Sequence, residues 1–204
     1  MGLEKMNSCA IILAAGASLR MGKPKQMLDI GGEKLLIKTV KAVLQTELSR
    51  VAVILGSDEE AHREILKGLP IELVYNADWK SGMGSSLKSG MRHLTAGNHS
   101  LEAVIVSVCD QPLLTSDTIS NLLKKYQETG KQIIASRYSQ MPGVPVLFGK
   151  PYFESLTRLP DDQGAKKIIL QNLSDVCEVD FPGGEIDLDT LEDYRRFQLG
   201  SEPS

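Results

Sequence analysis

Leu13-Ala14-Ala15-Gly16-Ala17-Ser18-Leu19-Arg20-Met21-Gly22-Lys23-Pro24-Lys25 is the stretch that decides the fold, and it follows an apolar run over residues 9–13. That run predicts a buried first strand of a parallel sheet. The small residues after it let another molecule approach the backbone, and their amides can point at anionic oxygens. Three cations follow, at Arg20, Lys23 and Lys25. A strand that ends in such a loop is suited to a nucleoside triphosphate.

The loop is not one of the two best-known phosphate loops. A P-loop has four residues between its glycines, followed by Lys and Ser or Thr. Here five residues separate Gly16 from Gly22, and Pro24 follows Lys23. The Gly-x-Gly-x-x-Gly fingerprint of dinucleotide-binding folds is absent as well. The spacing therefore predicts a long, open loop that covers phosphates.

This stretch resembles the signature of the MobA-like nucleotidyltransferases, Leu-Ala-(Ala/Gly)-Gly-x-Ser-x-Arg-Met-Gly followed by a lysine. Every position of the signature is filled, and Lys25 is the later lysine. The resemblance implies an α/β fold of three layers, Rossmann-like, with the mostly parallel mixed sheet of nucleotide-diphospho-sugar transferases. It also implies catalytic roles for Arg20 and Lys25. The nucleotide-binding positions it implies in this loop are Leu13, Ala14, Ala15, Gly16, Ser18 and Gly22.

Alanine at the third position of the signature, Ala15, resembles the cytidylyltransferase branch of the family. The resemblance implies transfer of CMP from CTP to the phosphate of molybdopterin or its molybdenum-loaded form, with Mg²⁺ or Mn²⁺ as cofactor. A molybdenum hydroxylase would then be the client. Three alternatives stay open: a GTP-using guanylyltransferase, a sugar- or polyol-phosphate nucleotidyltransferase, and a carrier that delivers a pterin cofactor without chemistry.

The composition is ordinary for a soluble globular protein. The 204 residues are 42% hydrophobic and 24% charged, which predicts one domain over residues 1–199 and a disordered tail over residues 200–204. A net charge of -3 gives no reason to expect nucleic acid as a partner, and no stretch is long enough to span a membrane. Cys9, Cys109 and Cys177 are scattered and have no metal-ligand spacing. We expect buried thiols and a cytoplasmic protein.

The pattern of apolar residues predicts alternating strands and helices, hence right-handed crossovers and a largely parallel sheet. The expected strands cover residues 51–55, 71–75, 103–108 and 132–136, and the expected helices cover residues 34–47, 58–67 and 115–129. Asp58 is expected to cap the second of these helices. The three histidines, His62, His93 and His99, are expected on the surface.

Residues 76–86 have two interpretations. They form either a simple loop into a helix capped by Ser85, with Leu87, Met91 and Leu94 on its buried face, or a second ligand loop. The segment resembles the family's Asn-x-x-Trp-x-x-Gly-Met-x-x-Ser, which contacts nucleotide. The resemblance implies further nucleotide-binding positions at Asn76, Gly82, Ser85 and Ser86.

Asp110 follows the most continuous apolar run of the chain. Ligands of open parallel sheets bind at the carboxyl ends of strands, and Mg²⁺ typically takes one or two carboxylates plus phosphate oxygens. A turn-forming aspartate is the alternative. The family's metal-binding Asp-x-Pro resembles this site, so Asp110 is expected to be catalytic and to bind the metal. The later segment Asp187–Asp193 resembles a family motif that implies Asp189, or less directly Asp187, as second metal ligand, although helix capping by Asp189 or Thr190 explains it equally well.

Two further segments carry weaker signals. Residues 140–148 resemble a family segment near the acceptor, but Val144 stands where many relatives have His. Residues 161–166 are expected to open a helix that buries Ile168, Ile169 and Leu173. No pair of nucleophile and base is present in the sequence pattern. None is required if the attacking group is already an anionic phosphate, because positioning and charge neutralisation then suffice.

Overall fold

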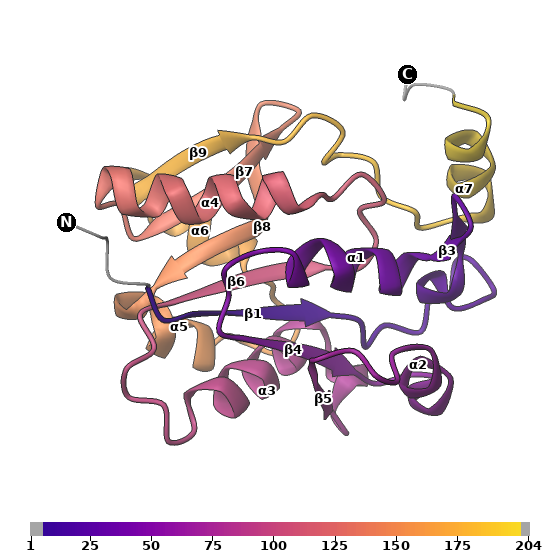
Figure 1. Cartoon of the computed structure of the whole chain (residues 1–204), viewed down its shortest axis with the longest axis horizontal. Helices are drawn as coiled ribbons and strands as arrows, with labels where there is room; N and C mark the ends of the chain where they lie inside the picture. The colour runs from indigo at the N-terminus through magenta and orange to yellow at the C-terminus, as the bar shows by residue number, and fades with distance from the viewer. Residues whose placement is uncertain (1–5, 201–204) are drawn as a thin grey trace.

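The computed structural model describes residues 6–200 and contains a seven-stranded sheet in the order β5-β4-β1-β6-β8-β7-β9 (Figure 1). The strands are β1 Ser8–Leu13, β4 Arg50–Leu55, β5 Glu72–Tyr75, β6 Ala103–Val108, β7 Ile133–Tyr138, β8 Met141–Gly149 and β9 Val176–Asp180. The helices are α1 Leu35–Leu44, α2 Glu59–Ile65, α3 Met83–Thr95, α4 Ser116–Thr129, α5 Phe153–Thr157, α6 Lys166–Gln171 and α7 Leu191–Gln198. A separate hairpin pairs β2 Asp29–Ile30 with β3 Glu33–Lys34.

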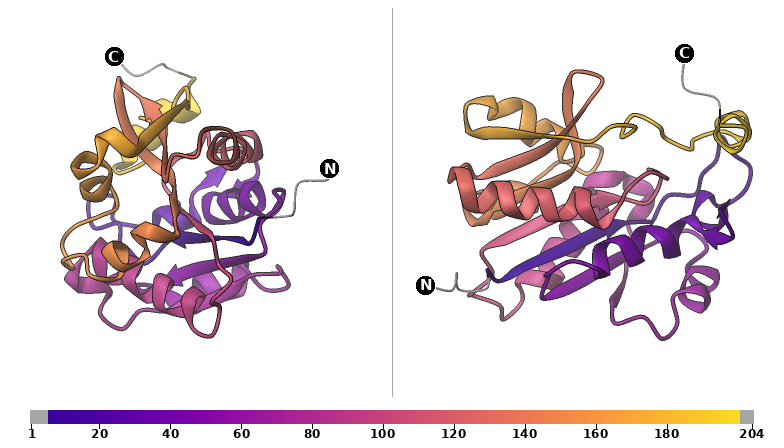
Figure 2. Two further views of the ribbon diagram at one scale, coloured as in Figure 1. Left: turned by 90° about the vertical axis from the view of Figure 1, so that its left-hand side faces the viewer. Right: turned by 45° about the horizontal axis from the view of Figure 1, so that its top comes forward.

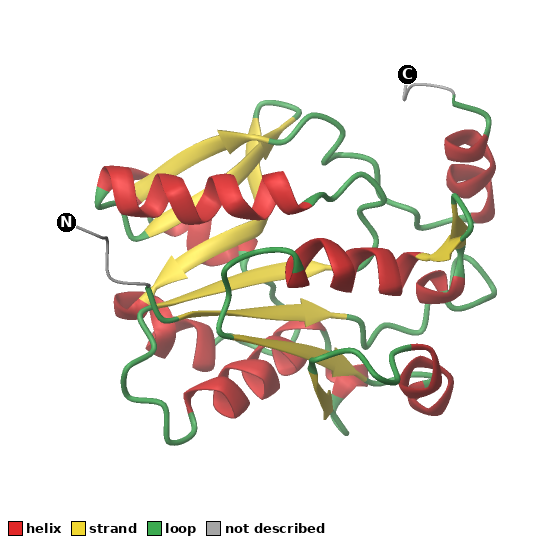
Figure 3. Ribbon diagram, in the orientation of Figure 1, coloured by secondary structure: helices red, strands yellow, loops and turns green. Residues whose placement is uncertain are grey.

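Helices cover both faces of the sheet, as the two further views of Figure 2 and the colouring by secondary structure in Figure 3 also show. Side chains alternate along each strand. Ile11 of β1 therefore packs with α3, α5 and α6 in one core, whereas Ile12 packs with α1 and α4 in the other. Because both faces are covered, the central strands β1 and β6 are buried throughout and mostly apolar. The predicted three-layer α/β fold is confirmed.

The sheet is mostly parallel but mixed. β1, β4, β5 and β6 run parallel, and β8 lies antiparallel between β6 and β7. The edge strand β9, parallel to β7, was not predicted from the sequence. Its residues are only half-buried or exposed, so they lack the continuous apolar pattern of the inner strands.

A third, small apolar cluster fixes the end of the described chain. It contains five buried residues and two aromatic residues of α7: Met21, Leu28, Ile30, Leu35, Leu188, Tyr194 and Phe197. The Tyr194 hydroxyl also donates to the Asp29 carbonyl at 2.8 Å. In Figure 1, α7 accordingly lies beside β3, at the end of the sheet toward which β1 points. The segment before α7 is thereby held next to the loop after β1.

Helix ends agree with the sequence in part. Thr190 caps α7, and its hydroxyl accepts from the Asp193 amide at 3.1 Å, so the predicted capping box is confirmed. Asp58 precedes α2 in a left-handed conformation and its side chain does not cap the helix, which corrects the prediction. Ser85 is not the cap of α3 either, because that helix begins at Met83 after Gly82. A Cβ on Gly82 would lie 2.4 Å from the Asp161 carbonyl, so close packing of this segment sets the helix start.

Three predicted environments are also corrected. Leu173 is 57% exposed because α6 ends at Gln171, before the residue could join its buried face. Cys177 is only half-buried, since it lies on the edge strand. His62 is fully buried. The other core positions predicted for α3 and α6 are buried as expected.

Within residues 6–200, no helix has both the length and the apolar character that crossing a bilayer requires. The predicted tail, residues 200–204, lies outside the described residues except for Gly200.

The burial of His62 makes stability depend on pH. Burial lowers the pKa of His62, against the attraction of Asp58, and neither ring nitrogen has a hydrogen-bond partner among the described residues. Below the ordinary pKa of about 6.5, the unfolded chain takes up a proton that the folded chain resists, so the free energy of unfolding falls as pH falls. At pH 5.5 this loss is expected to reach up to about 1.4 kcal/mol. Denaturant titrations at pH 7.5 and 5.5 test this.

The variant His62→Leu should lose this component of the pH dependence, and His99→Gln, which changes an exposed histidine, should retain it. The same acid destabilisation in His62→Leu as in the wild type would contradict the prediction.

Candidate functional site

A pocket of about 330 Å³ lies at the carboxyl ends of β1 and β6. The loop after β1 forms one wall, the segment between β5 and α3 forms another, and the end of β6 closes the pocket. Its lining residues are Leu13, Ala14, Ala15, Gly16, Ala17, Leu19, Lys25, Gln26, Trp79, Lys80, Gly82, Met83, Ser86, Val108, Cys109 and Asp110. Two loops far apart in the sequence therefore meet where ligands of open α/β sheets bind.

The loop after β1 is fixed at both ends. Its first residue, Ala14, donates its amide to the Ile54 carbonyl at 3.0 Å. Ser18 adopts a left-handed conformation, and its hydroxyl accepts from the Lys25 amide at 3.0 Å. The Met21 side chain is buried in the small cluster with α7. Between these fixed points Leu19, at 88% exposure, projects from the loop beside the pocket.

Lys25 contacts two carboxylates that lie far apart in the sequence, one from the middle of the chain and one from near its C-terminus. Its Nζ donates to Asp110 Oδ2 at 2.7 Å and to Asp189 Oδ1 at 2.8 Å. Arg20 contacts the other oxygen of Asp189, also at 2.7 Å. The Lys25 side chain is only 16% exposed, so water screens these contacts weakly. The small cluster with α7 explains how Asp189, next to buried Leu188, comes to lie here.

The charges in this cluster shift one another's pKa values. Burial acts to lower the pKa of Lys25, but Asp110 and Asp189 outweigh it and the pKa is raised. The hydrogen bond from Lys25 lowers the pKa of Asp189 despite its partial burial. Asp187 is the third carboxylate, and burial together with Asp110 and Asp189 raises its pKa to about 7. The cluster is thus rich in negative charge, with Lys25 at its centre.

One oxygen of this cluster has no partner. Asp110 Oδ1 is buried and accepts no hydrogen bond from any described residue. Over residues 6–200 there is no group of three or more His, Cys, Asp or Glu side chains placed to surround a metal. A free carboxylate oxygen beside a second carboxylate nevertheless fits a hard cation that takes its remaining ligands from phosphates.

The structure brings together eight of the predicted site residues as pocket lining: Leu13, Ala14, Ala15, Gly16, Lys25, Gly82, Ser86 and Asp110. Arg20 and Asp189 join through the charged cluster, whereas Ser18 and Gly22 support the loop outside the lining. Asn76 and Ser85 bond each other at 2.9 Å and line a separate polar pocket of about 350 Å³.

The lining residues that sequence reasoning left unassigned include Leu19, Gln26, Trp79 and Met83. Trp79 packs closely against the end of β4, where a Cβ on Gly56 would lie 2.6 Å from Trp79 Cγ. Trp79 belongs to the segment over residues 76–86 that resembles the family motif, so the sequence did contain an indication of its role. Gln26 follows the signature lysine and has no motif of its own.

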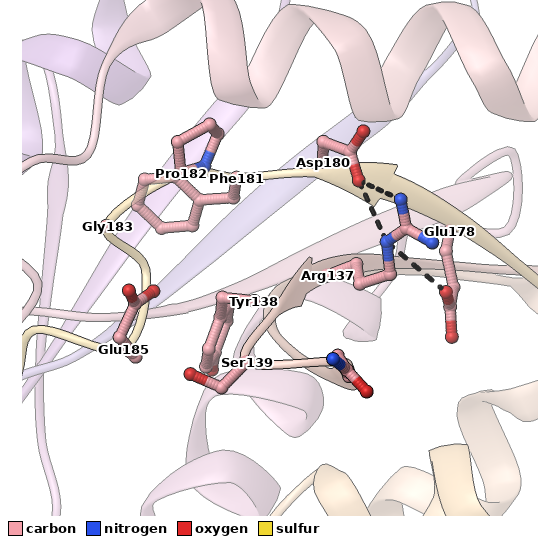
Figure 4. Close-up of a pocket in the computed structure, with 10 residues that line it drawn as sticks. Arg137, Tyr138, Ser139, Glu178, Asp180, Phe181, Pro182, Gly183 and Glu185 are labelled. Carbon is pink, nitrogen blue, oxygen red and sulfur yellow. Dashed lines mark hydrogen bonds and ion pairs between the residues drawn. The ribbon is translucent and has the colours of Figure 1, made fainter.

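A larger depression, of about 740 Å³, opens between the tip of the β7–β8 hairpin and the segment after β9 (Figure 4). Arg137 pairs with Asp180 at 2.5 Å, and the rings of Tyr138 and Phe181 meet edge to face with centroids 6.1 Å apart. One wall is tied to the charged cluster, because Gln111, next to Asp110, donates to the Gly184 carbonyl at 2.7 Å. We call this depression the hairpin groove.

Similar proteins include several with different names. A nicotine blue oxidoreductase of Paenarthrobacter nicotinovorans is 29% identical, over 91% of this chain and 94% of the relative. The purine catabolism protein PucB of Bacillus subtilis is 28% identical, over 90% and 92%. A molybdenum cofactor cytidylyltransferase of Escherichia coli is 27% identical, again over 90% and 92%.

Solved structures agree in fold. A homologue of Mycobacterium tuberculosis Rv0371c from Mycobacterium sp. strain JC1 superposes with a TM-score of 0.79 at 26% identity, covering 95% of this chain and 96% of the other. Rv0371c itself, solved in complex with manganese, gives a TM-score of 0.77 at 25% identity, covering 94% and 97%. The family model for the MobA-like NTP transferase domain matches residues 10–176, which include the whole pocket. The chain therefore belongs to the MobA-like NTP transferase family and is a nucleotidyltransferase.

Proposed function

We propose that this protein transfers CMP from CTP to the phosphate of molybdopterin or its molybdenum-loaded form, with Mg²⁺ as the metal and pyrophosphate as the leaving group. The observation that carries this proposal is the Lys25 ammonium between Asp110 and Asp189, at the edge of a pocket made of small residues. Such a site supplies both signs of charge that a metal-bound triphosphate requires. A pterin carrier would need no such cluster.

In this proposal the chain acts by positioning and charge neutralisation. The amides of residues 15–18 bind the nucleotide phosphates, and Arg20 and Lys25 neutralise charge as it moves onto the leaving pyrophosphate. Asp110 and Asp189 would hold the divalent cation, which would supply Lewis-acid stabilisation of the charge on the phosphates. An oxygen of the acceptor phosphate attacks the α-phosphorus, the bond to the β-phosphate oxygen breaks, and no general base is involved.

In this proposal the hairpin groove binds the part of the acceptor other than its phosphate. Its lining has three carboxylates, Glu178, Asp180 and Glu185, against one cation, Arg137. An excess of negative charge favours a neutral, donor-rich ring system over a second phosphate. The acceptor's own phosphate would then lie toward Lys25, past Gly184.

The proposal is tested by measuring pyrophosphate release from CTP and GTP with molybdopterin and with sugar or polyol phosphates as acceptors. Release only with CTP and molybdopterin is expected. Release with a sugar phosphate would replace the acceptor assignment, and release with none of them would favour a carrier.

Asp110→Asn should nearly abolish transfer, with turnover falling on the order of a hundredfold or more, because a neutral amide cannot balance the cation's charge. The fold should remain intact. Steady-state assays at saturating Mg²⁺, with thermal unfolding alongside, check this. Asp117→Asn, an exposed change on α4, is the matched control. Near-normal turnover by folded Asp110→Asn would remove the metal site from the proposal.

Lys25→Met should reduce turnover more than nucleotide affinity, since its charge matters most as the bond to pyrophosphate breaks. Loss of one such contact costs on the order of 3 kcal/mol in the barrier. Lys23→Met is the matched control, because the Lys23 ammonium lies over the Tyr194 ring at 5.1 Å rather than in the pocket. A change confined to KM, with turnover preserved, would contradict this role of Lys25.

Ala15→Gly should raise the use of GTP relative to CTP. The Ala15 methyl lies in the pocket lining and leaves less room for a purine. One methyl is worth about 1–3 kcal/mol of discrimination, so a partial shift is expected. Competition between CTP and GTP measures it, with Ala17→Gly as a control for loop flexibility. A wild-type preference for GTP would show that the cytidylyl assignment is wrong.

A further inference from the structure

Gln26 directs its buried amide at the backbone of the loop after β1. The residue lies in the 3-10 turn η1 Lys25–Met27 and is fully buried. Its Nε2 donates to the Ala14 carbonyl and to the Gly16 carbonyl, each at 2.9 Å. Both hydrogens of the amide are thus used on one loop, two residues apart. A buried amide group needs partners, and here they come from a segment that has no regular secondary structure.

These two bonds set the orientation of two peptide planes. A trans peptide is planar, so its N–H points opposite to its C=O. Because the Ala14 and Gly16 carbonyls point at Gln26, the amides of Ala15 and Ala17 point away from it. Packing cannot do this for Gly16, where a Cβ would meet no atom within 4 Å. The two hydrogen bonds from Gln26, which we call the polar clamp, therefore hold this part of the loop in place of side-chain packing.

The same turn also places the cation of the site. Lys25 immediately precedes Gln26, and its backbone amide donates to the Ser18 hydroxyl at 3.0 Å. A single turn of three residues thus fixes the start of the loop, its later part and the Lys25 ammonium. The relative position of the loop amides and the ammonium is set by this turn.

We propose that Gln26 is a positioning residue that turns the Ala15 and Ala17 amides toward the triphosphate. This inference rests on the proposed function. It assigns the preorganisation of the loop after β1 to Gln26, a residue outside the family-like signature. Without the two hydrogen bonds from Gln26, the nucleotide itself must order the loop, and the cost of that ordering weakens binding. The loss is greatest for a nucleotide whose phosphates bind the loop amides.

Binding of CTP, CMP and cytidine by the full chain tests the inference, with Gln26→Met as the variant because methionine is similar in size and has no donor. CTP affinity should fall about tenfold to a hundredfold, as expected for lost bonds to charged groups. The affinity for cytidine, which has no phosphate for the loop amides to bind, should fall much less. Ser136→Ala is the matched control: it removes another buried bond to backbone, 2.7 Å long to the Pro145 carbonyl, far from this loop.

Unchanged CTP affinity in Gln26→Met, or an equal loss for CTP and cytidine, would overturn the inference. A wild-type protein that binds no nucleoside triphosphate would instead overturn the proposed function. A second measurement does not depend on a variant folding: in the wild type, the amide proton resonances of Ala15 and Ala17 should shift much further with CTP than with cytidine. Shifts absent with bound CTP would also refute the positioning role.

Discussion

The contact of one lysine with two aspartates is the constraint on which the site depends. Lys25 follows the first strand, Asp110 follows the central strand, and Asp189 precedes the last helix. Removing the Lys25 charge leaves two partly buried carboxylates without their shared cation, which is costly in a weakly screened environment. The fold must therefore bring three distant segments to one point, and each has its own support.

The segments of the sheet and the segment that carries Asp189 are held by different apolar clusters. The two large apolar cores fix the paired strands β1 and β6, and with β6 the position of Asp110 just after its end. Lys25 lies in the turn η1, at the end of the loop that follows β1. Asp189 has no strand behind it, and the small cluster around Leu188 holds it instead. The Leu188 amide adds a bond of 3.2 Å to the Asp110 carbonyl. The small apolar cluster thus brings Asp189 to the charged cluster, which the two large cores alone do not do.

Relatives of similar identity bear the names of an oxidoreductase, a purine catabolism protein and a cytidylyltransferase. Likeness at this level identifies the family, whereas the reaction depends on particular side chains. In our proposal those side chains are the cation between carboxylates and the small residues in the pocket lining. The hairpin groove, lined by more carboxylates than cations, is a second and chemically different surface.

The sequence by itself determined the layers of the fold, because apolar strands alternating with amphipathic helices allow few other arrangements. It also located the pocket loops and Asp110, since a parallel sheet presents its strand ends at one edge. Only the tertiary structure decided the rest. Edge strand β9 lacks a continuous apolar pattern, and buried His62 lies in a helix too short to display its periodicity. The two bonds from Gln26 and the meeting of Lys25 with Asp189 join residues whose distance in space depends on packing, which local sequence does not encode.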